Sequence, residues 1–102
     1  MAVYERGPRW LPEKNVFDQP TMREHVAHHE ALGPRLLAAG PLQVEGTDTT
    51  VGVVLLIATS PEEAAKWLAD DPAVKAQVMM GKIREWRVSK IQAFSRETAP
   101  SR

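Results

Sequence analysis

VGVVLLIAT, residues 51–59, is the stretch of sequence that decides the fold. It is rich in β-branched residues, it carries no charge, and turn-like segments stand on both sides of it, at residues 46–49 and 60–61. A short, continuously apolar run of this kind is typical of a buried strand at the centre of a sheet. Its longest apolar run, residues 53–58, is far shorter than the roughly 20 residues that a membrane helix needs. We therefore expect a central strand over residues 51–59 and no membrane span.

The chain before this strand predicts two strands around one helix. Residues 1–6 and 42–45 read as strands, and residues 7–20 hold three prolines and form a long loop, of the kind that is often functional. Thr21 with Glu24 fits a capping box and predicts a helix to about Ala39, where a Gly-Pro pair stops it. Pro34 lies inside this span and predicts a kink or a restart of the helix.

The chain after the central strand predicts a second helix and a last strand. Ser60 with Glu63 forms another capping box, and the helix runs from there to about Ala69, before Asp-Asp-Pro. Residues 73–81 are ambiguous, with another helical turn or two as one option. Residues 82–88 alternate and predict the last strand, which residues 91–94 extend. We expect a single domain over residues 1–95 and a polar C-terminal tail over residues 96–102.

The predicted element order is βαββαβ. This order is the α+β, ferredoxin-like arrangement, with an antiparallel four-stranded sheet and two helices on one face. Because the central strand is apolar on both faces, the other face of the sheet needs a cover, and we expect a homodimer packed sheet against sheet.

Composition limits the class of protein. Lys+Arg and Asp+Glu both number 13, so the chain lacks the basic excess that is typical of proteins that bind nucleic acid. It has no cysteine, and its first residues do not follow the pattern of a signal peptide. We expect a cytoplasmic protein with no nucleic-acid partner.

The three histidines of the chain, His25, His28 and His29, all lie on the first predicted helix. At about 100° per residue, His25 and His29 fall within the apolar stripe of that helix and His28 at its edge. The positive end of the helix disfavours a charged His25, so this imidazole is a candidate general base. The alternative is that these histidines only pack in the core. We expect no metal, because no cysteine, further histidine or HExxH pattern completes a zinc site. A metal held by these histidines together with carboxylates is the alternative.

A general base needs a partner that fixes its tautomer, and Asp70 and Asp71 are the main candidates. Their alternative role is simply to end a helix as solvated carboxylates. In the long loop, Trp10 could stack on a planar ligand, with Arg9 or Arg23 binding its oxyanion. An equal alternative is that Trp10 closes the edge of the sheet. No glycine-rich phosphate loop is present, so we expect no nucleotide cofactor.

Several segments, in their order and spacing, resemble the YCII-related (YciI-like) family. They are Gly7-Pro8-Arg9-Trp10, His25-Val26-Ala27-His28, Leu37-Ala38-Ala39-Gly40-Pro41-Leu42, Gly52, Asp71-Pro72-Ala73-Val74 and Ile83-Arg84-Glu85-Trp86. The resemblance implies a dimeric α/β-barrel built from two ferredoxin-like units. It also implies a His-Asp dyad in a cleft, which maps onto His25 and Asp71, with Pro72 helping to orient it. At least one family member is a dehydrochlorinase of a chlorinated hydroxyquinol, so the resemblance implies that this scaffold supports proton abstraction with elimination.

Two departures from the family bear on the expected site. His29 stands where many relatives carry an aromatic or aliphatic residue, and Val53 stands where some carry a serine thought to help hold an oxyanion. We expect a small, cofactor-free lyase or isomerase in which His25 and Asp71 transfer a proton on a small oxygenated molecule. Aromatic and quinonoid compounds are among the candidates, and His29 could supply the missing donor. The alternative is a non-catalytic dimer that binds a metabolite, or serves as an accessory protein, through the same cleft.

Overall fold

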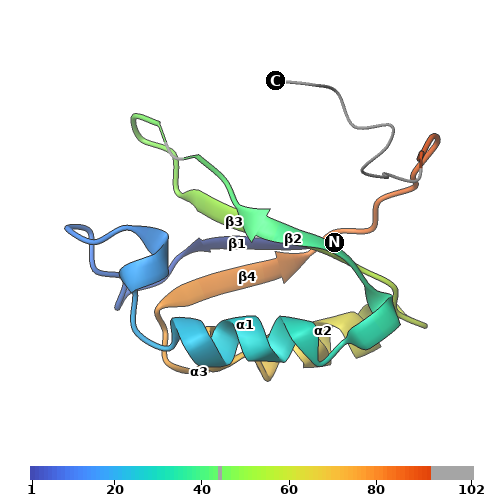
Figure 1. Cartoon of the computed structure of the whole chain (residues 1–102), viewed down its shortest axis with the longest axis horizontal. Helices are drawn as coiled ribbons and strands as arrows, with labels where there is room; N and C mark the ends of the chain where they lie inside the picture. The colour runs from blue at the N-terminus through green and yellow to red at the C-terminus, as the bar shows by residue number, and fades with distance from the viewer. Residues whose placement is uncertain (44, 93–102) are drawn as a thin grey trace, which may run out of the picture.

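The computed structural model describes residues 1–43 and 45–92. The elements, in chain order, are β1 (Ala2–Arg6), the 3-10 turn η1 (Val16–Asp18), α1 (Met22–Glu30), the 3-10 turn η2 (Gly33–Arg35), β2 (Leu36–Pro41), β3 (Thr50–Leu56), α2 (Pro61–Ala69), α3 (Pro72–Lys75) and β4 (Met79–Ile83). The helices lie together in one layer beneath the sheet (Figure 1).

The sheet has the strand order β2-β3-β1-β4, and its neighbouring strands are antiparallel. β1 therefore lies at the centre of the sheet, between β3 and β4, although it begins the chain. This order, with the helices on one face, is the ferredoxin-like arrangement and confirms the predicted α+β fold. The apolar run that predicted a central strand forms β3, the other inner strand of the sheet.

β1 carries a tyrosine into the layer between the sheet and the helices. Tyr4 pairs with Gly52 of β3 on one side and with Gly81 of β4 on the other. Directly opposed residues of antiparallel strands share a face, so the ring of Tyr4 is flanked by two positions without side chains. Tyr4 is 2% exposed, and Ala2, on the same face, is fully buried opposite Val54.

The first helix is much shorter than the sequence predicts. α1 ends at Glu30, and residues 36–39, expected as the last turn of the helix, belong to strand β2 (Leu36–Pro41) instead. The predicted restart near Gly33 is the short 3-10 turn η2, which begins at Gly33, with a φ of 59°, and includes Pro34. The next residues then pair with β3, Leu36 opposite Leu56 and Ala39 opposite Val54. The prediction of a strand over residues 42–45 is wrong for residues 42, 43 and 45, since β2 ends at Pro41, and residue 44 lies outside the described residues.

The last strand lies earlier in the chain than predicted. β4 covers Met79–Ile83, whereas the alternation in the sequence predicted residues 82–88. β4 pairs residue for residue with the five residues of β1, from Ala2 opposite Ile83 to Arg6 opposite Met79, so its partner sets its position. Beyond Ile83, Trp86 and Val88 are about half exposed. Of the predicted extension over residues 91–94, residues 93 and 94 lie outside the described residues, as does the predicted tail.

The two predicted capping boxes differ in the structure. Ser60 caps α2 as expected, because its Oγ accepts a hydrogen bond of 3.1 Å from the N–H of Glu63. Glu63 does not return the bond to Ser60, and its carboxylate binds Thr59 instead. Thr21 makes no side-chain cap, and its backbone is left-handed, with φ of 64°. The predicted capping box at Thr21 is therefore wrong.

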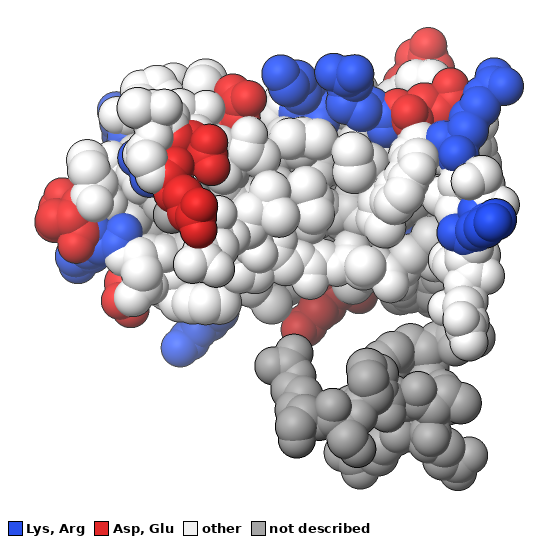
Figure 2. All heavy atoms as spheres, turned by 90° about the horizontal axis from the view of Figure 1, so that it is seen from above, with Lys and Arg blue, Asp and Glu red and all other residues white. Residues whose placement is uncertain are grey.

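The face of the sheet that points away from the helices is apolar at its centre. Val3 pairs with Val53 on this face, Leu55 is half-buried beside them, and Leu37 is 54% exposed. Figure 2 views the molecule from above and shows a broad uncharged band, with most charged side chains towards the ends. The cover of this face by a second copy of the chain remains a prediction. Among the described helices, none is long and apolar enough to span a bilayer.

Candidate active site

Two of the three histidines of α1 point into the layer beneath the sheet. His25 and His29, one helical turn apart, are 7% and 8% exposed, and their ring centroids lie 4.1 Å apart. His28 turns elsewhere: its Nε2 donates to the carbonyl of Trp67 at 2.7 Å, and its ring stacks on that indole at 4.9 Å. The helical wheel therefore separated the three histidines correctly.

Asp71 is fully buried and lies against His25. Nδ1 of His25 is 2.8 Å from Oδ2 and 3.0 Å from Oδ1 of Asp71. Asp71 also caps the short helix α3, since its Oδ1 accepts from the N–H of Ala73 at 2.9 Å. Its neighbour Asp70 is exposed. The structure thus decides between the two carboxylates, and it brings together two groups that are 46 residues apart.

Tyr4, which the sequence did not single out, joins this group. Its hydroxyl donates to Oδ2 of Asp71 at 2.7 Å and lies 3.2 Å from Nε2 of His29. Because the hydroxyl proton is given to Asp71, the phenol oxygen is free to accept a hydrogen bond from His29. Tyr4 is the only tyrosine in the sequence, and it lies within the predicted first strand. The glycines that face Tyr4 were the signal that could have revealed it.

The protonation states of Asp71, Tyr4 and His25 follow from their contacts. Burial opposes ionisation of Asp71, but the hydrogen bonds from His25 and Tyr4, together with the imidazole of His29 at 3.6 Å, outweigh it and hold the pKa of the carboxyl well below its ordinary value. Burial, together with the nearby charge of Asp71, raises the pKa of Tyr4 well above its ordinary range. Asp71 is therefore the charged member, and Tyr4 stays a neutral donor. His25 then donates from Nδ1, which leaves a lone pair on Nε2 when the ring is neutral.

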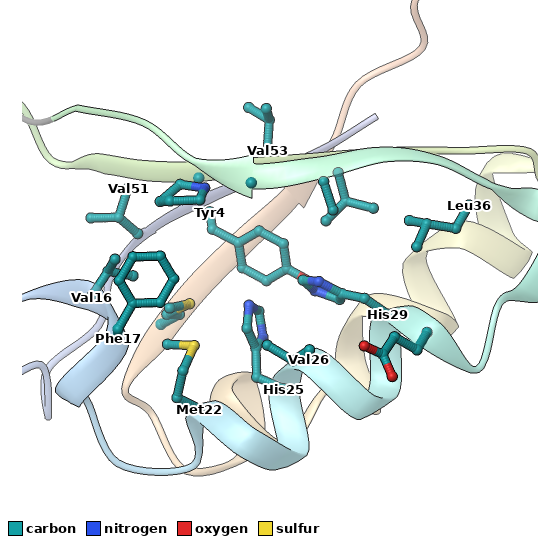
Figure 3. A pocket seen from close by; sticks show the side chains of 17 residues that line it. Tyr4, Val16, Phe17, Met22, His25, Val26, His29, Leu36, Val51 and Val53 are labelled. Carbon is teal, nitrogen blue, oxygen red and sulfur yellow. The ribbon is translucent and has the colours of Figure 1, made fainter. Parts of the chain in front are cut away.

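A cavity of about 290 Å³ opens between α1 and the strands β2 and β3. His25 points up into it from the helix, and Tyr4 and His29 lie beside that ring (Figure 3). Its other walls are mostly apolar, with Met22, Val51 and Phe17 among them. In the part of the chain that the structure describes, Nε2 of His25 has no hydrogen-bond partner.

The other residues expected to bind substrate lie away from this cavity wall. Arg9 and Arg23 are exposed, and Trp10 is half-buried and packs against the core, with Arg6 above its ring at 5.8 Å. Pro72 begins α3 directly after Asp71. Arg9, Trp10, Arg23 and Pro72 do not line the cavity in this chain, and their roles in binding stay predictions.

Val53 stands where some relatives carry a serine. It is among the residues that line the cavity, but its side chain points to the far side of β3 (Figure 3). A hydroxyl on that side chain would therefore point away from His25.

His25, His29 and Asp71 together offer three possible metal ligands within 4.8 Å of one another. Three is the smallest number of protein ligands in a zinc site. Both carboxylate oxygens of Asp71 already accept hydrogen bonds. Oδ1 accepts from the N–H of Ala73, Oδ2 accepts from the hydroxyl of Tyr4, and the N–H of His25 is shared between the two oxygens. The arrangement thus matches a hydrogen-bonded acid–base group, and a metal would have to displace these bonds.

Known proteins resemble this chain in sequence and in fold. A family model for the YCII-related domain matches residues 11–90. The chain belongs to the YCII-related family. Among solved structures, the YCII-related chain is similar to 5-chloro-2-hydroxyhydroquinone dehydrochlorinase from Burkholderia phenoliruptrix AC1100, in complex with 2,5-dihydroxybenzoquinone. The TM-score is 0.63 at 22% identity, over 84% of this chain and 91% of that one. No curated protein matches the chain. At this identity, the structural likeness supports the fold of this YCII-related protein.

Proposed function

We propose that this YCII-related protein is an enzyme that transfers a proton on a small molecule, with His25 as general base and Asp71 as its partner. One observation carries the proposal: Nδ1 of His25 is bonded to a buried carboxylate, while the ring points into an open cavity. The carboxylate fixes the tautomer and stabilises the imidazolium that forms. A purely structural histidine has no need of a free nitrogen at a cavity.

In the proposed reaction, Nε2 of His25 removes a proton from a carbon that a neighbouring carbonyl makes acidic, in a ketone or in the keto form of a phenol. The electron pair of the broken C–H bond moves into the ring or the carbonyl. In an elimination, a leaving group on the adjacent carbon departs with its own electron pair. In an isomerisation, the imidazolium returns the proton to another atom of the substrate. In both cases the charge on His25 is balanced by Asp71, and no external oxidant or reductant is needed.

Tyr4 and His29 would support this step from one side. Tyr4 holds Oδ2 of Asp71 in place at 2.7 Å, and His29 reaches the Tyr4 oxygen at 3.2 Å. Such a connected group keeps the carboxylate charged although it is fully buried. We assign positioning roles to Tyr4 and His29. For His29, the role of a donor to a substrate oxyanion is an alternative.

The substrate class is inferred from the cavity and from the structural neighbour. A volume of about 290 Å³ suits a molecule of the size of a single substituted ring. The neighbouring structure is a dehydrochlorinase with a bound dihydroxybenzoquinone. A small oxygenated ring, aromatic or quinonoid, therefore becomes the first substrate class to test.

The test measures chloride release from 5-chloro-2-hydroxyhydroquinone and deuterium uptake from D₂O by a panel of cyclic ketones. We expect turnover by the wild-type protein and a loss of about 10²- to 10⁴-fold in His25→Asn and Asp71→Asn. Asp70→Asn is the matched control, because that carboxylate is adjacent but exposed. Full activity in His25→Asn would overturn the proposal. Ligand binding with no turnover on any of these compounds would favour the non-catalytic alternative.

A further inference from the structure

The loop over residues 11–19, before α1, is held in one conformation by the buried side-chain amide of Gln19. Gln19 is only 4% exposed. Its Oε1 accepts from the N–H of Leu11 at 2.8 Å, and its Nε2 donates to the carbonyls of Leu11 at 2.7 Å and Lys14 at 3.0 Å. A buried polar side chain that is fully hydrogen-bonded makes a rigid and specific connection. The loop is therefore fixed although it pairs with no strand.

This loop presents Phe17 at the mouth of the cavity. Asn15 fixes the local backbone, since its Oδ1 accepts from the N–H of Phe17 at 2.9 Å. Phe17 lines the cavity together with Met22 and Val51, yet 70% of it is exposed (Figure 3). A phenyl ring gains free energy from burial, so a rigid loop that leaves it exposed at a cavity offers it to a ligand.

The carboxylates around the cavity have no lysine or arginine beside them on its walls. Glu30 lines the cavity and Asp71 lies just behind the wall, and the described residues that line it include no lysine or arginine. A ligand carboxylate would lose its hydration on entering and would find no lysine or arginine on these walls to pair with. The cavity therefore favours a ligand without negative charge.

We propose that Phe17, positioned by Gln19, selects a flat and uncharged ligand for this site. The inference rests on the proposed function, because it takes the cavity beside His25 as the place where substrate binds. A flat ring in the cavity can lie against Phe17 with its edge towards His25. Aromatic pairing of this kind strengthens binding about 2- to 13-fold beyond the effect of buried area alone.

Three unreactive probes separate shape from charge. Phenol is flat and uncharged, cyclohexanol has the same size but is not flat, and benzoate is flat but negatively charged. Their affinities for the full chain are measured near neutral pH by titration, followed through the backbone NMR signals of residues around His25 and Gly52. We expect phenol to bind more tightly than either of the other two.

Variants test the part played by the loop. Phe17→Leu should reduce the preference for phenol over cyclohexanol by about 2- to 13-fold, and Phe17→Trp should keep it. Gln19→Glu keeps the shape of the side chain but loses both N–H donors, so it should lose the preference as Phe17→Leu does. Asp18→Asn, an exposed position in the same turn, is the matched control and should behave like the wild-type protein.

The proposal is overturned if benzoate binds as tightly as phenol, if none of the probes binds, or if Phe17→Leu keeps the full preference. It is supported if the preference disappears in Phe17→Leu while cyclohexanol still binds. Because the probes do not react, these results are independent of turnover. An inactive protein with the expected preference would refute the proposed reaction and leave the role of Phe17 intact.

Discussion

The carboxylate of Asp71 accepts hydrogen bonds from two side chains that are distant in sequence and from the backbone two residues further on. His25, Tyr4 and the N–H of Ala73 all donate to it, and it has no exposed surface. A buried charge is tolerated only when such partners compensate the loss of water. Asp71→Ala would leave three donors without an acceptor, and we expect it to cost about 3–5 kcal/mol of stability.

Stability should depend on pH through Asp71. The pKa of this carboxyl lies well below its ordinary value of 3.8, so the unfolded chain binds more protons than the native state once the pH falls below about 5. The stabilisation is present above that range and is lost as the pH falls towards the lowered native pKa. Urea unfolding at a series of pH values should show a steep acid loss in the wild-type protein and a shallower one in Asp71→Asn.

The control for this experiment is Asp70→Asn, which changes an exposed carboxylate next in sequence. It should follow the wild-type curve. Parallel curves for the wild-type protein and Asp71→Asn would contradict the assignment of the acid-sensitive charge to Asp71.

Tyr4 should be energetically coupled to Asp71. Tyr4→Phe removes the O–H that donates to the carboxylate at 2.7 Å, and a hydrogen bond to a charged group contributes about 1.5–3 kcal/mol. In the Asp71→Asn background the same change should cost less, because a neutral amide accepts a weaker bond. Thermal or urea unfolding of the four proteins of this cycle measures the coupling, which we expect to be on the order of 1 kcal/mol. Strictly additive effects would show that the two groups act independently.

Among the elements, the helices α1 and α2 begin in different ways. Ser60 caps α2 through Oγ, whereas Thr21 precedes α1 with a left-handed backbone and no side-chain cap. A β-branched residue at a φ of 64° is strained, because its Cβ meets the following carbonyl. α1, which carries the site histidines, therefore starts without the side-chain cap that α2 has.

Substitutions at the two helix starts should therefore have opposite effects. Ser60→Ala should destabilise the protein by about 1 kcal/mol through the lost cap. Thr21→Gly should stabilise it, by up to about 1 kcal/mol, since glycine adopts the left-handed region without strain. Urea unfolding of both variants measures the two changes. A loss of stability in Thr21→Gly would mean that the threonine side chain makes a contribution outside the cap.

At the scale of the whole molecule, the sheet presents one covered and one open face. The helices cover the face of Tyr4 and Ala2. The other face is apolar around Val3 and Leu55, with the ion pair of Glu5 and Lys82 on its β4 side. An open apolar face of this kind is typical of an interface between copies of a chain. The homodimer, as a barrel of two such sheets, remains our prediction for this family member.

The predicted dimer can be tested by mass. Sedimentation or light scattering should give about twice the chain mass of 11.3 kDa. Leu55→Lys places a charge on the open face and should produce a monomer, because a buried unpaired charge costs several kcal/mol. Ala69→Lys, at the exposed end of α2, is the matched control and should leave the mass unchanged. A wild-type protein that is monomeric at high concentration would refute the dimer.

The sequence by itself determined the order of the elements and which histidines of α1 face the sheet. Those features are local: helical spacing places His25 and His29 on one side, and proline and glycine mark where elements stop. An apolar run of the right length was enough to identify β3. The family resemblance then pointed to Asp71, which periodicity could not distinguish from Asp70.

Only the tertiary structure decided the bounds of β2 and β4 and the membership of Tyr4 in the site. Strand pairing joins segments that are far apart in the sequence. Pairing with β1 therefore set where β4 lies, and pairing with β3 placed residues 36–39, predicted as helix, in a strand. Tyr4 faces the site because the pairing of β1 with β3 and β4 places it on the helix side of the sheet, on the same face as Ala2. Such register is a property of the assembled sheet, and no single segment of the chain encodes it.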